Sequence, residues 1–152
     1  MRIDETDRRL LRQMQVAPEL GVNELAERAN VTPATARRRL EKLRGAGVLR
    51  AVSMAVDWPA LGYSVQVSLR ISLDKSENNA FDAFLAAARE VPEVLEIQTF
   101  LGRVDVRLAV VARDMTHYQE LYRSRILTLP HITDIEALMD VAEVKDRTAL
   151  PL

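Results

Sequence analysis

One stretch of the chain decides the first domain: residues 32–45, TPATARRRLEKLRG. It carries the start and stop signals of a helix. Thr32 can accept a backbone N–H at the N-cap, and Pro33 follows at the first helical position, where its missing N–H costs nothing. Gly45 and Gly47 then favour an end to the helix. The sequence therefore predicts a capped helix that begins at Pro33.

The two faces of this helix differ in chemistry. At about 100° per residue, one face is apolar and contains Ala36, Leu40 and Leu43. The opposite face contains Ala34, Thr35, Arg38, Glu41 and Lys42, with Arg37 at its border. Arg39 leans back toward the core, so we expect it to pair with a carboxylate or to hold a phosphate. A basic helix face is more often only solvated surface. The neighbouring residues must therefore distinguish a DNA-binding face from a solvated one.

A shorter helix comes directly before it. Residues 23–29 place Leu25, Ala26 and Ala29 on one inner side, and residues 30–31 turn into Thr32. Two short helices joined by about four residues, the second of them basic, form the helix-turn-helix pattern of DNA-binding proteins. This context favours a DNA-binding face over a merely solvated one.

The flanking segments complete a domain. Asp4 can cap a first helix whose apolar stripe is Leu10, Leu11 and Met14 and which ends before Pro18. Residues 47–57 are β-branched and loosely alternating, which predicts a two-stranded wing. Residues 1–57 are therefore predicted to form a winged helix-turn-helix domain.

The charge of the chain is unevenly divided. Residues 1–50 contain 11 Lys and Arg against 7 Asp and Glu, whereas the remaining 102 residues contain 10 against 15. The basic part suits double-stranded DNA, and the acidic part suits another role. The chain has no cysteine, which excludes disulfides and cysteine-based zinc sites. No stretch has the length of a membrane span and the N-terminus is charged, so we expect a cytoplasmic protein with no membrane partner.

The second half alternates strands and helices. Residues 58–62, WPALG, are predicted to be a linker, and residues 63–152 a second domain. Its predicted strands are residues 63–73, 94–101, 104–111 and 132–144, with a two-residue turn at Gly102-Arg103; its predicted helices are residues 79–90 and 114–126. The order βαββαβ predicts an α+β fold, a ferredoxin-like four-stranded antiparallel sheet with both helices on one face.

The first strand suggests self-association. Its aliphatic row, Val65, Val67, Leu69, Ile71 and Leu73, would leave apolar sheet exposed in a single copy, so we expect a second subunit to cover it. The alternative is that Ser64, Gln66, Ser68 and Ser72 form a side that faces water. In the first helix of this domain, the buried side is predicted to contain Phe81, Phe84, Leu85 and Ala88.

Across its length the chain resembles the Lrp/AsnC (feast/famine) family of transcriptional regulators. The matching residues in the first domain are Ile3-Asp4, Asp7, Leu10-Leu11, Glu24-Leu25-Ala26, Val31-Thr32 through Arg39, Leu43 and Gly47-Val48-Leu49. Those in the second are Leu61-Gly62, Pro92-Glu93-Val94, Gly102, Asp105, Asp114, Leu129-Pro130 and Val144-Lys145. The resemblance implies a DNA-binding head and a ferredoxin-like (RAM) domain that forms homodimers and assembles further into tetramers or octamers. It also implies that an amino acid or related small molecule binds between dimers, where the turn at residues 102–105 faces the last strand of a neighbouring subunit.

These expectations name two sets of site residues. The DNA-binding set is Thr32, Ala34, Thr35, Arg37, Arg38, Lys42, Arg44 and Arg50, with Thr35, Arg38 and Lys42 nearest the bases and Arg37, Arg44 and Arg50 on phosphates. The effector-binding set implied by the resemblance is Leu101, Gly102, Arg103, Val104, Asp105, Leu138, Met139 and Asp140. In this set Gly102 would let backbone donors approach a carboxylate, and Asp105 would accept from an ammonium group. The residues alone favour a plainer interpretation, in which Gly102 is a turn residue and Asp105 a turn-capping carboxylate.

Some residues depart from the pattern of the family. Leu101 replaces a common threonine, Arg103 and Arg107 add positive charge near the turn, and His131 stands where the family typically has glycine. Arg103 could clamp an anion, although solvated surface arginines are commoner. These departures concern the identity of the effector and leave the fold unaffected.

Two other classes of function are compatible with a chain of this size. One is an oligomeric small-molecule sensor whose head does not bind specific DNA, which the basic helix face argues against. The other is an enzyme, but His117 and His131 are the only histidines, and the sequence shows no nucleophile triad, phosphate loop or histidine-based metal cluster. His117 is expected on the exposed side of a helix. We therefore expect no catalytic residue, no metal and no cofactor apart from the effector.

Overall fold

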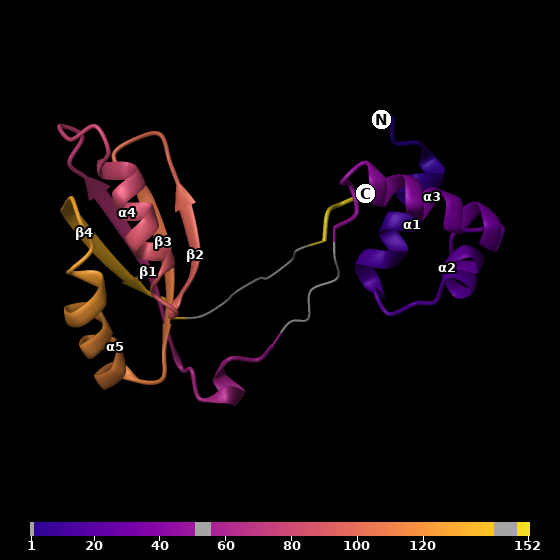
Figure 1. Cartoon of the computed structure of the whole chain (residues 1–152). Coiled ribbons are helices and arrows are strands. Elements are labelled where there is room, and N and C mark those ends of the chain that lie inside the picture. The colour runs from indigo at the N-terminus through magenta and orange to yellow at the C-terminus, as the bar shows by residue number, and fades with distance from the viewer. Residues whose placement is uncertain (1, 51–55, 142–148) are drawn as a thin grey trace. The chain divides into compact units, whose positions relative to one another are not determined.

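The computed structural model describes residues 2–50, 56–141 and 149–152 (Figure 1). The chain divides into two compact units, which we call the head unit (Met1–Ala55 with Lys145–Leu152) and the sheet unit (Val56–Val144). Residues 149–152 thus group with the head unit, whereas the division drawn from the sequence placed them in the second domain. Over the described ranges, no helix is both long enough and apolar enough to cross a membrane.

The head unit contains the three predicted helices: α1 (Glu5–Val16), α2 (Val22–Arg28) and α3 (Pro33–Gly45). Their buried core consists of Leu10, Leu25, Ala26, Ala29, Ala36 and Leu40, which are the apolar positions expected from the helical spacing. Between α2 and α3, Asn30 has a φ of 54°, a left-handed conformation that asparagine tolerates better than most residues. The tight turn of the helix-turn-helix is confirmed.

Charged residues fix the start of α1 and join it to α3. The side chains of Asp4 and Asp7 each accept a backbone N–H from the other, at 3.0 and 3.1 Å, which is a reciprocal capping box. Arg39 Nη1 lies 2.6 Å from Asp4 Oδ2 and 3.3 Å from Asp7 Oδ1. The pKa of Asp4 is lowered, first by the N–H of Asp7 and further by the Arg39 guanidinium. The expectation that Arg39 pairs with a carboxylate is confirmed.

The predicted wing falls partly outside the described residues. After α3, Gly47 has a φ of 69°, and the N–H groups of Val48 and Leu49 both donate to Leu43 O. This is a helix-ending turn, and no strand is present at residues 47–50 or 56–57. Residues 51–55, where the rest of the wing was placed, are not described.

The sheet unit has the predicted βαββαβ order. Its strands are β1 (Val65–Leu73), β2 (Val94–Thr99), β3 (Val106–Ala112) and β4 (Ile132–Met139), and they pair antiparallel in the order β2-β3-β1-β4. Helices α4 (Ala80–Arg89) and α5 (Met115–Leu121) cover one face of the sheet (Figure 1). A π-helical turn, η2 (Tyr122–Ile126), continues α5, and a short 3-10 turn, η1 (Pro59–Leu61), precedes β1. The ferredoxin-like arrangement is confirmed; residues 142–144 of the predicted last strand are not described.

The core of this unit lies between the sheet and its helices. Val67, Leu69, Ile71 and Leu73 of β1 are buried there, beside Phe84 of α4. The expectation that this aliphatic row needs a second subunit to cover it is therefore wrong, because α4 and α5 already do so. The uncovered face of the sheet carries a polar network: Arg107 Nε donates to Ser68 Oγ at 2.7 Å, and Arg107 Nη1 donates to Gln98 Oε1 at 2.8 Å.

The buried side of α4 differs from the prediction at Phe81, at Ala80 and in part at Leu85, which is only partly buried. Ala80, Phe84 and Ala88 are buried, at the i, i+4 spacing of a single helix row. Phe81 lies beside this row and is 39% exposed, so its predicted burial is wrong.

The connection between β2 and β3 is also longer than predicted. It spans residues 100–105 in place of a two-residue turn. Asp105 turns away from a hairpin position because its backbone N–H donates to Ile71 O of β1 at 2.9 Å. The connection is thus hydrogen-bonded to β1 at Asp105, one residue before β3 begins.

Candidate functional site

The first candidate site is the start of α3. Thr32 Oγ1 accepts the backbone N–H of Thr35 at 3.2 Å and donates to Thr35 Oγ1 at 2.9 Å. The cap predicted from the sequence is therefore present. Because Thr35 Oγ1 only accepts in this pair, its own hydroxyl hydrogen is left to donate to another group.

The basic residues of α3 form an exposed cationic surface. Arg37, Arg38, Lys42 and Arg44 are exposed, as is Arg50 after the turn. Within the described part of the chain, none of these five side chains forms an ion pair, in contrast to Arg39, which is held by Asp4 and Asp7. Their charges are therefore available to phosphates or bases.

A surface hollow lies along the same face of the helix. It is lined by Pro33, Ala34, Arg37, Arg38 and Glu41. Small Ala34 leaves room between the helix start and the two arginines, which suits close approach of a groove edge. Glu41 was not among the predicted site residues, although its place on the outward face was visible in the helical spacing. A carboxylate there can accept from a cytosine amino group and disfavours phosphate.

The second candidate site is the connection at residues 100–105. Leu101 is fully exposed and Phe100 nearly half exposed, so the tip of this connection is apolar and uncovered. Gly102 has a φ of 157°. Arg103 presents its backbone carbonyl to Ser72 Oγ at 2.8 Å, and this bond ties the connection to the end of β1.

Asp105 is used inside the fold. It is 5% exposed; its Oδ2 accepts the N–H of Leu73 at 2.9 Å, and its Oδ1 lies 2.9 Å from Lys75 Nζ. Burial alone would raise the pKa of this carboxyl, but the Leu73 N–H and the Lys75 ammonium outweigh it, and the pKa is lowered. Asp105 therefore has a structural role, but it accepts from Leu73 of β1 and not from a backbone N–H of its own turn, as the turn-capping interpretation had it. In this conformation the carboxylate already has two partners.

The two halves of the predicted effector set lie apart within one chain. Leu138 pairs with Ser68 and the N–H of Asp140 donates to Gln66 O, near the start of β1. Asp105 contacts Leu73 at the other end of β1. Leu73 lies five residue steps along the strand from Ser68, which is about 16 Å. A single subunit therefore does not bring Leu101–Asp105 together with Leu138, Met139 and Asp140.

These features define a two-unit protein with a DNA-binding type of head and a ferredoxin-like second unit. The AsnC-type helix-turn-helix domain model matches residues 3–44, and the Lrp/AsnC ligand binding domain model matches residues 66–150. The chain belongs to the Lrp/AsnC family of transcriptional regulators.

Named relatives match this chain over nearly its whole length and nearly the whole of theirs. The DNA-binding transcriptional activator DecR of Escherichia coli K12 is 27% identical over 150 residues, covering 99% of both chains. The crystal structure of the regulator NMB0573 in complex with L-Met, from Neisseria meningitidis, matches with a TM-score of 0.91 and 27% identity over 99% of this chain and 97% of that one. The structure of E. coli AsnC matches with a TM-score of 0.88 and 26% identity, over 97% of this chain and 98% of that one.

Proposed function

We propose that this protein is a sequence-specific DNA-binding transcriptional regulator whose DNA affinity or assembly is changed by an amino acid or a related small molecule. The observation that carries the DNA-binding part is the row of exposed cations on the capped helix α3. Four basic side chains there, Arg37, Arg38, Lys42 and Arg44, have no carboxylate partner in the described chain, and two of them, Arg37 and Arg38, line a surface hollow. The regulator class follows from the family.

The proposed DNA contacts divide by position on the helix. Thr35, Arg38 and Lys42 approach base edges in the major groove, because they lie on the outward face near the helix start and middle. Arg37, Arg44 and Arg50 hold phosphates and fix the register. A homodimer would present two such helices to a pseudo-palindromic site, one helical turn of DNA apart.

The effector proposal requires more than one subunit. The exposed apolar tip at Phe100-Leu101 is the kind of surface that a neighbouring protein covers. The 16 Å separation along β1 leaves Leu138–Asp140 out of reach of the tip of the same chain. We therefore propose that the tip of one subunit meets β4 of another in a tetramer or octamer built from dimers. The Neisseria relative, crystallised with L-Met, supports an amino acid as the ligand class.

The effector would change the assembly or the spacing of the heads because it binds one arrangement of the subunits more tightly than another. The proposal requires no other cofactor and no catalytic residue. We also propose a cytoplasmic location, as for other DNA-binding regulators of this family. The alternative, a sensor without specific DNA binding, is disfavoured because its helix α3 would have no need of unpaired cations.

A binding assay with designed variants tests the DNA contacts. A preferred duplex is first selected from a random pool, and its affinity is compared with that of random DNA by fluorescence anisotropy over a range of salt. Arg38→Ala should weaken binding to the selected duplex by about 1–3 kcal/mol and relax the preference at one position. Arg44→Ala should weaken both duplexes alike and reduce the salt slope by about one. Arg125→Ala, an exposed arginine of the sheet unit, is the control.

Either of two results would contradict the proposal. One is wild-type affinity and salt slope in all three variants, which would show that these arginines of α3 do not contact DNA. The other is an equal loss for Arg38→Ala on selected and random DNA, which would remove the assignment of Arg38 to a base.

The effector part is tested by light-scattering mass and thermal unfolding with each of the twenty amino acids. A change in mass or melting temperature with one amino acid supports the proposal. The variant Leu101→Ser makes the apolar tip more polar and should abolish that response. The fold of each subunit should be unchanged, because Leu101 is fully exposed. Indifference to all twenty would reject an amino acid as the effector.

A further inference from the structure

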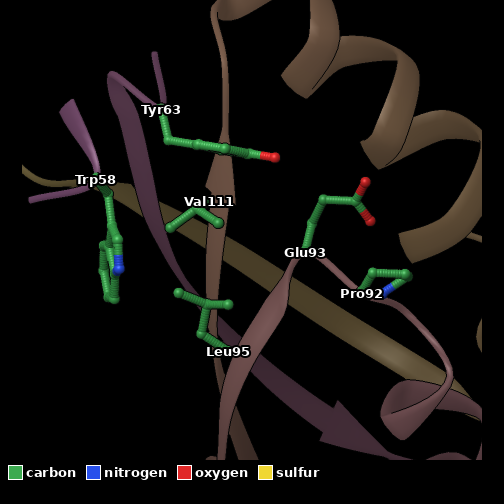
Figure 2. Close-up of a pocket in the computed structure, with 6 residues that line it drawn as sticks. All are labelled: Trp58, Tyr63, Pro92, Glu93, Leu95 and Val111. Carbon is green, nitrogen blue, oxygen red and sulfur yellow. The ribbon is translucent and has the colours of Figure 1, made fainter. Parts of the chain in front are cut away.

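A second pocket lies in the sheet unit, away from the connection at residues 100–105. It is lined by Trp58, Tyr63, Pro92, Glu93, Leu95 and Val111 and has a volume of about 170 Å³ (Figure 2). This volume is close to that of a protein cavity that holds one benzene molecule. By comparison with benzene, the pocket suits a ligand of about five to eight heavy atoms.

The pocket has an apolar floor between an aromatic wall and a carboxylate. Figure 2 shows Trp58 and Glu93 on opposite sides, with Val111 and Leu95 between them, and the hydroxyl end of Tyr63 pointing toward the Glu93 side. Glu93 is the one charged residue among the described residues that line the pocket. A ligand that fills it would meet apolar surface along its body and a negative charge at one end.

The charge of Glu93 is only weakly engaged by the protein. Its ion-pair partner among the described residues is at most His117, whose Nε2 lies 3.8 Å from Glu93 Oε1, beyond hydrogen-bond distance. His117 Nδ1 accepts the backbone N–H of Arg113 at 3.1 Å, so the neutral ring carries its proton on Nε2. His117 is 14% exposed in its side chain, so it is largely covered and its expected surface position is wrong. Among the described residues, the Glu93 carboxylate therefore has no close cationic partner and can accept from a ligand.

The walls of the pocket are held by backbone hydrogen bonds. The N–H groups of Leu61 and Tyr63 both donate to Trp58 O, at 2.9 and 3.0 Å, and Gly62 between them has a φ of 86° that favours glycine. On the other side, the N–H of Val111 donates to Glu93 O at 3.0 Å. Trp58, Tyr63 and Glu93 are therefore placed by the fold before any ligand arrives, which lowers the entropic cost of binding.

We propose that this pocket binds a small organic ammonium ion, with its charge at Glu93 and its alkyl body against Trp58, Leu95 and Val111. A carboxylate that accepts from an ammonium forms a charge-assisted hydrogen bond, and the apolar side chains remove the alkyl body from water. An anion would meet the Glu93 charge at this site and is disfavoured. The inference does not depend on the proposed effector site, because the two share no residue.

The protein provides its own probe for this test. Trp58 is the only tryptophan in the chain, so intrinsic fluorescence reports on the pocket directly. The full-length protein is titrated with n-butylammonium chloride, and separately with 1-butanol and sodium butyrate at equal ionic strength. For a ligand of five heavy atoms, dissociation constants in the millimolar range are expected. The expected result is a saturable change with butylammonium only.

Two variants separate the charge from general effects. Glu93→Gln keeps the size of the side chain and should weaken butylammonium at least tenfold, as for loss of a charge-assisted bond. Glu120→Gln removes an exposed carboxylate of α5 and should bind like the wild type. Equal responses to butanol and butylammonium, an undiminished response in Glu93→Gln, or no saturable response in the wild type would each overturn the proposal. Unchanged far-ultraviolet circular dichroism confirms that each variant is folded.

Discussion

The carboxylate of Asp105 should stabilise the sheet unit, and the size of its contribution can be worked out from its two partners. Asp105→Ala leaves the Leu73 N–H without an acceptor at a buried position, and a hydrogen bond to a charged acceptor contributes about 1.5–3 kcal/mol. The Lys75 side chain is 70% exposed, so its ion pair contributes roughly 0.5 kcal/mol. We expect Asp105→Ala to lower the free energy of unfolding by about 2–3 kcal/mol and Lys75→Ala by less than about 1 kcal/mol.

Urea unfolding at one fixed protein concentration measures both variants, since assembly contributes to apparent stability. The pKa of Asp105 is lowered in the fold, so its stabilisation is present above the unfolded pKa of about 3.9 and is lost as pH falls through the folded value. The difference between wild type and Asp105→Ala should therefore be constant at neutral pH and shrink below about pH 4.

The reasoning about Asp105 would be refuted if Asp105→Ala unfolded at the same urea concentration as the wild type. It would also fail if Lys75→Ala cost as much, because the Leu73 bond would then not be the main contribution. A variant of normal stability that no longer responded to an amino acid would return Asp105 to the role of an effector ligand.

Three further changes test other parts of the structure. His131 has a φ of 64°, so His131→Gly should raise the free energy of unfolding by about 0.5–1 kcal/mol; a lower urea midpoint would show that the imidazole stabilises more than the backbone strain costs. Asp7→Ala removes half of the capping box and should lower the stability of the head unit by about 1–2 kcal/mol, with faster amide exchange in α1 as the readout and unchanged exchange in β3 as the control. Deleting residues 149–152 should also speed exchange in α1, because Arg12 Nε donates to Leu152 O at 2.6 Å; protection equal to that of the intact chain would contradict a stabilising role for this contact.

The sequence predicted best where the signal was local. The caps at Asp4 and Thr32 and the apolar spacing of α1, α2 and α3 lie within one or two helix turns, so each could be seen without knowledge of the fold. The alternation of β1 was equally clear, but which face the helices would cover was not. Which face of the sheet the helices cover depends on how the connections of the whole unit cross the sheet. The prediction of an exposed aliphatic row was wrong for this reason.

Features that depend on distant partners were missed. The acceptor role of Asp105 requires Leu73, which is 32 positions away in sequence, so spacing alone suggested a short hairpin instead. The pocket beside Trp58 joins a segment predicted as a linker to Glu93 and Val111, and no local pattern relates them. A linker that contains the only tryptophan of the chain was a usable signal, because a large aromatic side chain is seldom left without packing partners.

The head unit is built from two separate pieces of chain. Leu150 and Leu152 line a groove with Leu11 and Met14 of α1 and with Val48 and Leu49 after α3, although more than 100 residues intervene. A fragment cut at residue 57 would therefore lack part of its own wall and expose that groove to water. Anyone who builds chimaeras by exchanging heads between relatives should move the last four residues together with the first fifty, because these two pieces form one packed unit.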